Sequence, residues 1–236
     1  MASRTFLTKN AKLLKPLGII LTIVIILALG WQFGMPHYRP GLEEGEVYGI
    51  DVSNHQKSLN WSKVAQDDIA FAYIKATEGS SAQDKSFQRH WQGAKRAGLH
   101  TGAYHYFSLC SSGKTQAENF LRTIPGDSRM LPAALDLEFS PFCDNHPSRR
   151  EVLKHIDQVL ELVGSGTDKQ VLLYVGDDFD RTYRIKDHYR DLKYWQLRYL
   201  LRPTDKRDYI WQVGGFFYVD GAPGKVDLNI GRIDDL

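Results

Sequence analysis

The chain has 236 residues, of which 42% are hydrophobic and 25% charged, a composition typical of a globular protein with one sizeable core. The formal net charge of +2 conceals an asymmetry, because residues 1–40 contain five Lys or Arg and no acid, which leaves the rest of the chain at −3. That remainder has no basic stripe of the kind that binds nucleic acid, so we expect no nucleic-acid partner.

An uncharged, apolar segment runs from Pro16 to Pro36. A membrane-spanning helix needs about 20 apolar residues, and basic residues before it keep the N-terminus in the cytoplasm. We therefore expect a cytoplasmic basic segment at 1–16 and a single-pass signal anchor at 17–35 in the inner membrane, with the following domain in the periplasm. A cleaved signal peptide stays open as the alternative, because residues 17–29 resemble its apolar region and "ALG" before Trp31 resembles a cleavage site.

A linker at 36–46, rich in Pro, Gly and charge, leads to a globular domain at 47–236. Eight strand-like runs follow, at 47–53, 69–77, 100–107, 130–138, 170–176, 193–200, 208–213 and 225–231. Helical patterns separate the early runs, at about 84–97, 115–123 and 148–163, and the last of these has a capping box at Ser148 and Glu151 and a stop signal at Gly164. Only about seven residues separate Leu200 from Asp208, too few for a helical crossover. The pattern predicts an α/β barrel whose last strands are joined by hairpins or short loops.

Two acids, Asp136 and Glu138, end the apolar run of the fourth strand. Alternate residues of a strand share a face, so both carboxylates point the same way at the end of the barrel where catalytic groups gather. Two close carboxylates raise the pKa of one of them, and glycoside hydrolysis requires such an acid pair. Asp51 ends the first strand at the same rim. Solvated acids at a loop entry, a turn at Asp51, and a metal site built from these three acids are the alternatives.

Lys75 lies inside the apolar run of the second strand and needs a carboxylate partner, for which Glu78 and the rim acids are candidates. A purely structural ion pair is equally open. Aromatic residues are dense along the strands and can either stack on sugar rings or fill the core: Tyr104, Tyr106, Tyr174, Trp195, Tyr199 and Trp211. The sequence has no G-x-S-x-G, P-loop or H-E-x-x-H motif, and we expect neither a cofactor nor a bound metal.

Nine runs occur in an order that resembles glycoside hydrolase family 25, the Chalaropsis-type lysozymes or N-acetylmuramidases: "YGIDVSNHQ", "NWSKV", "FAYIKATEG", "GAKRAGLHTGAYHYF", "QAENF", "LPAALDLE", "YWQLRY", "IWQV" and "KVDLN". The resemblance covers roughly Tyr48 to Asp234. It implies a TIM-like flattened barrel of about five β/α units followed by three strands. It also implies hydrolysis of the β-1,4 bond between N-acetylmuramic acid and N-acetylglucosamine in peptidoglycan. The "WQV" at 211–213 departs from the more usual W-Q-Y of the family.

The same resemblance implies roles for individual residues. Glu138 matches the catalytic acid, Asp136 the group that stabilises or orients the reacting centre, and Asp51 a third acid of the site. Lys75, Tyr106 and Tyr174 match positions that line the sugar groove, and Asp227, in "VDLN", matches a further acid that we expect to take part in substrate binding. A covalent nucleophile and assistance by the substrate's own 2-acetamido group both stay open.

Two cysteines, Cys110 and Cys143, follow closely on the third and fourth strands at one rim. In an exported domain they are expected to form a disulfide. We further expect a monomer whose partners are the peptidoglycan glycan strand and, through its N-terminal helix, the membrane. A catalytically silent wall-binding or scaffold protein is the alternative function, although such a protein would not need three clustered acids.

Overall fold

The computed structural model describes residues 17–235, which divide into one compact unit ending at Arg39 and another beginning at Pro40. The first unit is an apolar helix of 21 residues, Leu17–His37. Its last turns are a π-helix, η1 (Gly30–Gly34), followed by a 3-10 helix, η2 (Met35–His37). Its length and composition fit a membrane span and a signal sequence equally. The predicted cytoplasmic segment at 1–16 lies outside the described residues.

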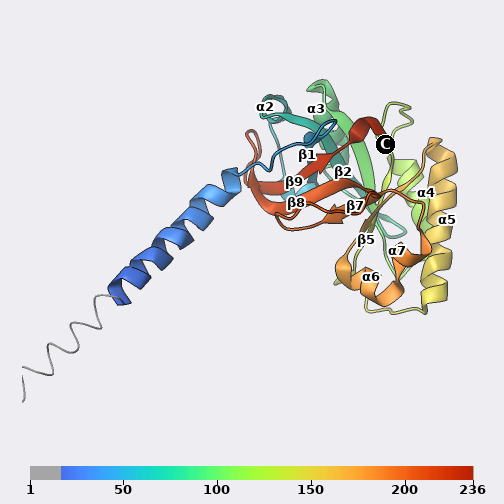
Figure 1. Ribbon diagram of the computed structural model, residues 1–236. Helices are drawn as coiled ribbons and strands as arrows, with labels where there is room; N and C mark the ends of the chain where they lie inside the picture. The colour runs from blue at the N-terminus through green and yellow to red at the C-terminus, as the bar shows by residue number, and fades with distance from the viewer. Residues whose placement is uncertain (1–16, 236) are drawn as a thin grey trace, which may run out of the picture. The chain divides into compact units, whose positions relative to one another are not determined.

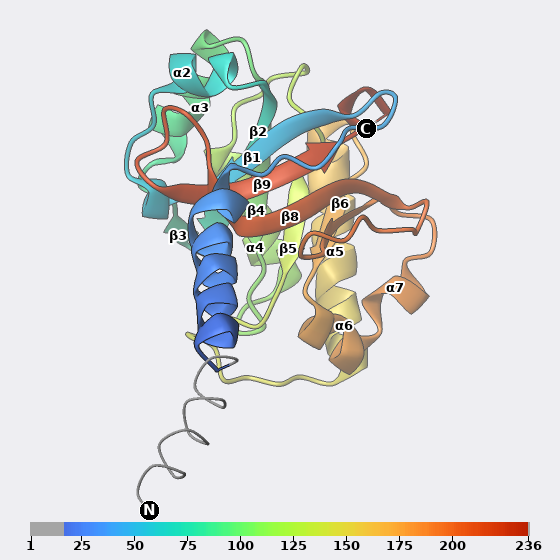
Figure 2. The same ribbon diagram turned by 60° about the vertical axis from the view of Figure 1, so that its left-hand side comes forward.

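The second unit is built on one sheet whose strands close into a barrel (Figures 1 and 2). Its strands are β1 (Val47–Val52), β2 (Ile69–Glu78), β3 (Ala82–Gln83), β4 (His100–Tyr106), β5 (Ala134–Leu137), β6 (Leu172–Val175), β7 (Tyr194–Leu197), β8 (Asp208–Tyr218) and β9 (Lys225–Gly231). They are hydrogen-bonded in the order β1-β9-β8-β7-β6-β5-β4-β2-β3, and an additional β1–β2 pairing closes eight of them into a ring. The short strand β3 is attached outside that ring, so the predicted eight-stranded barrel is confirmed.

The barrel is mixed because its last strand runs against its neighbours. All pairings from β1 through β2, β4, β5, β6 and β7 to β8 are parallel, whereas β9 is antiparallel to both β8 and β1. The connection from β7 to β8 contains no helix, as the spacing predicts, and β8 and β9 form a hairpin. Strand β8 continues five residues past the predicted end at Val213, with register shifts around Gly214. Gly214 adopts a positive φ of 147° there, a conformation that glycine permits.

Helices cover the outside of the barrel: α2 (Trp61–Gln66), α3 (Phe87–Arg96), α4 (Gly113–Thr123), α5 (Arg149–Thr167), α6 (Asp177–Tyr183) and α7 (Ile185–His188). Two 3-10 turns, η3 (Asn54–Gln56) and η4 (Ile233–Asp235), complete the unit. Helix α5 begins with the predicted capping box of Ser148 and Glu151. The predicted stop at Gly164 is wrong, because the helix continues to Thr167 and ends where Asp168 adopts a left-handed conformation.

Two cores hold the strands in place. One lies between the strands and the surrounding helices, and the other consists of the side chains that point into the barrel. Inside the barrel, Trp195 packs against Tyr73, Tyr104 and Tyr174 with ring centroids 5.0, 6.3 and 5.4 Å away. These rings form an apolar floor beneath the carboxyl ends of the parallel strands, where the inward-facing positions become polar.

Candidate active site

A cavity of about 300 Å³ opens at the carboxyl ends of the parallel strands. All seven residues that the sequence predicts for the site line it: Asp51, Lys75, Tyr106, Asp136, Glu138, Tyr174 and Asp227. They come from β1, β2, β4, β5 and the residue that follows it, β6 and β9. The barrel closure therefore brings together side chains that lie up to 176 positions apart in the sequence.

Asp51 is buried and held by two amide side chains. Its Oδ2 accepts hydrogen bonds from Gln212 Nε2 at 2.9 Å and from Asn229 Nδ2 at 2.8 Å. These amides are oriented in turn, because Gln212 Oε1 accepts from the Tyr174 hydroxyl at 3.1 Å and Asn229 Oδ1 accepts from Trp195 Nε1 at 2.9 Å. Burial raises the pKa of Asp51 well above its ordinary value, and the nearby charge of Asp227 raises this pKa further. The hydrogen bonds from the two amides lower it.

Asp136 also points into the barrel, but it lacks the hydrogen-bond donors that hold Asp51. Its Oδ1 is buried without a hydrogen-bond partner among the described residues. Burial raises the pKa of Asp136 well above its ordinary value, the adjacent Glu138 raises it further, and the Lys75 ammonium lowers it. A buried carboxyl oxygen with nothing to bind is poised to interact with a group that enters the cavity.

Glu138 follows β5 and lies against the backbone at the end of β6. A Cβ added to Gly176 would come within 3.1 Å of Glu138 Cγ and 3.4 Å of its Oε1, so a larger residue here would require the Glu138 side chain to shift by a few tenths of an ångström. Burial raises the pKa of Glu138, and the charge of Asp227 adds to the increase. The Tyr174 hydroxyl and the Lys75 ammonium lower the pKa of Glu138 and so oppose this increase.

Lys75 pairs with Glu78, whose Oε2 lies 2.7 Å from the lysine Nζ. The ammonium group also lies over the ring of Tyr106, 4.5 Å from its centroid. The Tyr106 hydroxyl donates to the carbonyl of Phe139 at 3.2 Å, which ties β4 to the loop that begins just after Glu138. Lys75 thus combines both roles that the sequence left open, since it forms an ion pair with Glu78 and also lines the cavity.

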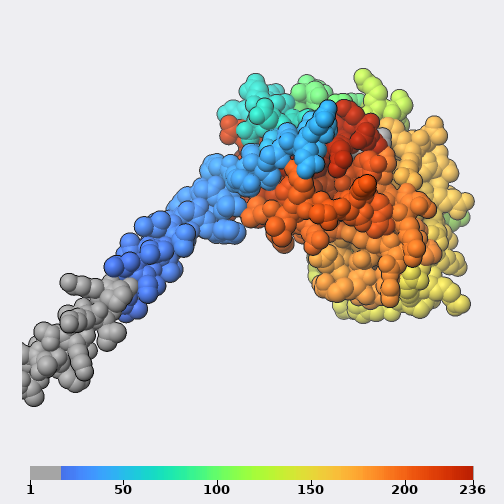
Figure 3. Space-filling view, viewed as in Figure 1, coloured from blue at the N-terminus to red at the C-terminus, as the bar shows by residue number. Residues whose placement is uncertain are grey.

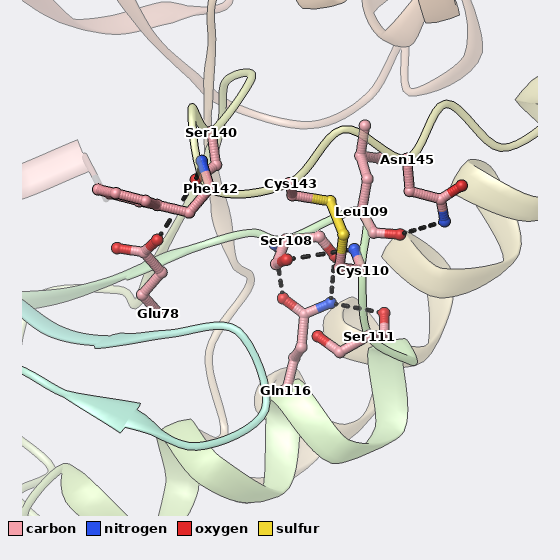
Figure 4. The surroundings of a disulfide bond; sticks show 10 residues. All are labelled: Glu78, Ser108, Leu109, Cys110, Ser111, Gln116, Ser140, Phe142, Cys143 and Asn145. Atoms are coloured by element: carbon pink, nitrogen blue, oxygen red, sulfur yellow. Dashed lines mark hydrogen bonds between the residues drawn. A yellow bond between two sulfur atoms is a disulfide. The ribbon is translucent and has the colours of Figure 1, made fainter.

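A disulfide joins the loops that follow β4 and β5 (Figure 4). Cys110 and Cys143 have Cα atoms 5.9 Å apart, and Asn145 Nδ2 donates to the carbonyl of Leu109 at 3.1 Å beside them. Gln116 of helix α4 holds the first of these loops, because its Nε2 donates to the carbonyls of Ser108 and Ser111 at 2.9 and 3.0 Å. The loop that carries on from Glu138 is therefore anchored at the rim.

A second, larger cavity of about 520 Å³ adjoins the first. Its lining comes from the residues that follow β5, the β6–α6 segment, and the end of β7 with the loop after it: Glu138, Phe139, Tyr174, Val175, Gly176, Asp177, Asp178, Phe179, Gln196, Leu197, Arg198, Tyr199 and Leu201. Figure 3 shows the segments after β6, in orange and red, over much of the visible face of this unit. Glu138, Tyr174 and Leu197 line both cavities, so Glu138 lies at their junction.

Sequence reasoning missed the two amides that hold Asp51. Gln212 and Asn229 are polar residues at inward-facing positions of otherwise apolar strands, and that alternation is the signal that could have identified them. Among residues 17–235, no group of three or more His, Cys, Asp or Glu side chains is arranged to hold a metal ion.

Comparison with known proteins gives concordant results. The family model described as "Glycosyl hydrolases family 25" matches residues 50–221. The chain is 35% identical over 200 residues to the uncharacterized protein YegX of Escherichia coli K12, covering 80% of this chain and 72% of that one. It is 30% identical over 187 residues to the autolytic lysozyme of Clostridium acetobutylicum, covering 77% of this chain and 54% of the relative.

Solved structures show the same likeness. A family 25 glycosyl hydrolase from Bacillus anthracis superposes with a TM-score of 0.73 at 32% identity, over 83% of this chain and 93% of that chain. A bacterial lysozyme from Streptomyces coelicolor superposes with a TM-score of 0.71 at 30% identity, over 78% of this chain and 90% of that chain.

Proposed function

The chain belongs to glycosyl hydrolases family 25, and we propose that it is a lysozyme that hydrolyses the β-1,4 bond between N-acetylmuramic acid and N-acetylglucosamine in peptidoglycan. The observation that carries this proposal is the position of Glu138 at the junction of two adjoining cavities. A polysaccharide that occupies both cavities passes the glutamate in mid-chain, which is the arrangement that internal cleavage of a glycan requires.

We assign the general acid to Glu138. Glycoside hydrolysis needs a carboxyl group that is still protonated when it meets the leaving oxygen, and burial together with Asp227 raises the pKa of Glu138 in that direction. Its close packing against Gly176 fixes where the carboxyl group is presented. Protonation of the leaving oxygen by Glu138 breaks the bond between the two sugars as positive charge develops on the ring. A water molecule then completes the hydrolysis at the same ring carbon and returns a proton to Glu138.

We assign stabilisation of that positive charge to the aspartates. Asp136 presents an unpartnered oxygen to the cavity, and it can face the developing oxocarbenium centre or orient the 2-acetamido group of the substrate. Asp51 is held in one orientation by its two amides, so it presents its carboxyl group at a fixed position in the cavity. Tyr106 and Lys75 form the wall beside them and serve the sugar hydroxyl groups.

We propose that the enzyme acts on the cell wall outside the cytoplasmic membrane. The helix Leu17–His37 would act as a single-pass anchor in the inner membrane, so that the catalytic unit reaches the peptidoglycan from the periplasmic side as a monomer. Within that unit, Arg202 pairs with Glu46 and donates to the carbonyl of Gly41 at 2.6 Å, so residues 41–46 are fastened to the β7–β8 loop.

Product analysis tests the proposal. Purified full chain is incubated with peptidoglycan, the products are reduced with borohydride, and the new reducing ends are identified by mass spectrometry. A muramidase yields reduced N-acetylmuramic acid, and the yield should be the same with and without a chelator. New ends formed on N-acetylglucosamine would contradict the assigned bond, loss of activity with the chelator would favour a metal-dependent hydrolase, and binding without any new ends would favour a silent wall-binding protein.

A further inference from the structure

The larger of the two cavities carries charges that a neutral sugar chain does not require. Asp177 begins helix α6 on one side of this cavity, and Arg198 stands in the β7–β8 loop on another. Within the described part of the chain, neither side chain makes a hydrogen bond or an ion pair, and the charge of Arg198 acts only at longer range on Asp208, whose pKa it lowers. Unpaired groups of opposite sign in one cavity suit a ligand that carries both a carboxylate and an amine.

The position of Arg198 is well defined even though its side chain is exposed. Its backbone N–H donates to the carbonyl of Gln212 at 3.0 Å, and its own carbonyl accepts from Trp211 Nε1 at 2.7 Å. The base of the residue is thereby fixed on β8, next to the strand position that holds Asp51. The guanidinium group is left available to a carboxylate, with which arginine forms paired hydrogen bonds.

Two apolar side chains line the same part of the larger cavity as Asp177 and Arg198. Tyr199 and Leu201 are 63% and 71% exposed, respectively, and both line the cavity. A Cβ added to Gly214 would come within 3.1 Å of Tyr199 Cδ1, so the tyrosine ring rests on the backbone of β8. An exposed aromatic ring with a rigid support offers contact area to aliphatic side chains of a ligand at little cost in conformational entropy.

We propose that this lobe, lined by Asp177, Arg198, Tyr199 and Leu201, binds the peptide stem attached to the muramic acid unit of the substrate. The proposal rests on the proposed function. In stem-bearing peptidoglycan the lactyl carboxyl group of N-acetylmuramic acid is consumed in the amide bond to the stem, so the sugars themselves are neutral. The groups that carry carboxylates, amines and alkyl side chains together belong to the peptide stems. Arg198 pairs with a stem carboxylate, Asp177 pairs with a stem amine, and Tyr199 with Leu201 contacts the alkyl parts. The enzyme is therefore selective for glycan strands that keep their stems.

The test compares two substrates with the full chain. Soluble glycan strands bearing peptide stems are compared with the same strands stripped of stems by an amidase, whose freed lactyl carboxyl groups are converted to methyl amides so that the sugars stay neutral. Both substrates are assayed for kcat/KM from newly formed reducing ends. The kcat/KM of wild type should be about 10-fold higher on stem-bearing strands, which is the effect expected of one strong charge-assisted contact. Arg198→Ala should bring that ratio close to 1, and Asp177→Asn should lower it. Arg122→Ala, which removes an exposed arginine from helix α4, is the matched control and should keep the wild-type ratio.

The outcomes separate the two claims. Hydrolysis of both substrates with a wild-type ratio near 1, or with a ratio that Arg198→Ala leaves unchanged, would overturn stem recognition and leave the muramidase assignment standing. Failure of wild type to cleave either substrate would contradict the proposed function and stem recognition with it.

Discussion

Asp51 and Asp227 lie directly opposite each other in the antiparallel pairing of β1 with β9, and both side chains line the same cavity. Like charges in that position are unfavourable, since facing carboxylates repel each other. Burial raises the pKa of both carboxyl groups, and the charge of Asp227 adds to the increase at Asp51. The fold thus tolerates a local repulsion at the point where we propose that positive charge develops during the reaction.

Because of this repulsion, we predict that Asp51 and Asp227 lower the stability of the folded protein at neutral pH. A carboxyl group whose pKa is raised by folding binds its proton more tightly in the folded state, so stability falls as pH rises from the ordinary carboxyl pKa through the raised one. Asp51→Asn should therefore increase Tm at pH 7 by about 3 °C or more, with a smaller gain near pH 4, while activity falls. The two hydrogen bonds survive, because both reach a single oxygen of Asp51.

The control for that prediction is an aspartate with the opposite shift. The pKa of Asp127 is lowered, chiefly by its hydrogen bond with Lys95. This carboxylate contributes stability above its ordinary pKa, so Asp127→Asn should lower Tm at pH 7, to a small extent because the pair is at the surface. Differential scanning calorimetry of the variants at pH 4 and pH 7 measures both signs, and a lower Tm for Asp51→Asn at pH 7 would contradict the account.

A second prediction concerns the pH profile of activity. The Lys75 ammonium lowers the pKa of both Glu138 and Asp136. Removal of this charge in Lys75→Met should raise the pKa of the general acid, so the alkaline limb of kcat/KM should move to higher pH. Lys114→Met, on the exposed side of helix α4, should leave the profile in place. An alkaline limb that stays fixed, or moves to lower pH, in Lys75→Met would exclude an electrostatic role for this lysine.

A third prediction uses the contact between Gly176 and Glu138. The methyl group introduced by Gly176→Ala would press on Glu138 Cγ at 3.1 Å and displace the carboxyl group. Because a misplaced catalytic group loses much of its effect, kcat should fall by about 10-fold with little change in Tm. Gly126→Ala, where an added Cβ meets nothing within 4 Å, should retain wild-type kcat. Equal kcat for both variants would show that the position of Glu138 is not limiting.

A fourth prediction concerns the disulfide. It closes a loop with a sequence separation of 33, which in the chain-entropy model stabilises the fold by about 3 to 4 kcal/mol. The double variant Cys110→Ser, Cys143→Ser should lose about that amount in urea unfolding, and dithiothreitol should destabilise wild type without affecting the variant. A double variant as stable as the oxidised wild type would show that the hydrogen bonds of Asn145 and Gln116 hold the rim by themselves.

Much of this architecture follows from local patterns in the sequence. The capping box at Ser148 marks the start of α5, the short interval before Asp208 excludes a helix between β7 and β8, and the spacing of Asp136 and Glu138 predicts that they share a face. The end of α5 could not be predicted, because a glycine such as Gly164 is tolerated inside a helix whose other residues pack well.

The site's supporting residues were harder to predict for a different reason. The roles of Gln212 and Asn229 depend on which strands become neighbours, and only closure of the barrel brings them to Asp51. Arg198 lies within the run 193–200 that the sequence predicts as a strand, but β7 ends at Leu197, so its place at the cavity depends on how the following loop returns to β8. Long-range pairing, rather than local propensity, determines these contacts.

The most direct test of the account is the activity of Glu138→Gln. The full-length variant and wild type are compared for release of reducing ends from peptidoglycan, with thermal unfolding measured on the same samples. We expect kcat to fall by about 100-fold to 10,000-fold, since glutamine cannot donate the proton, while Tm stays equal to or above that of wild type. Release of reducing ends by Glu138→Gln at the wild-type rate would contradict the central claim.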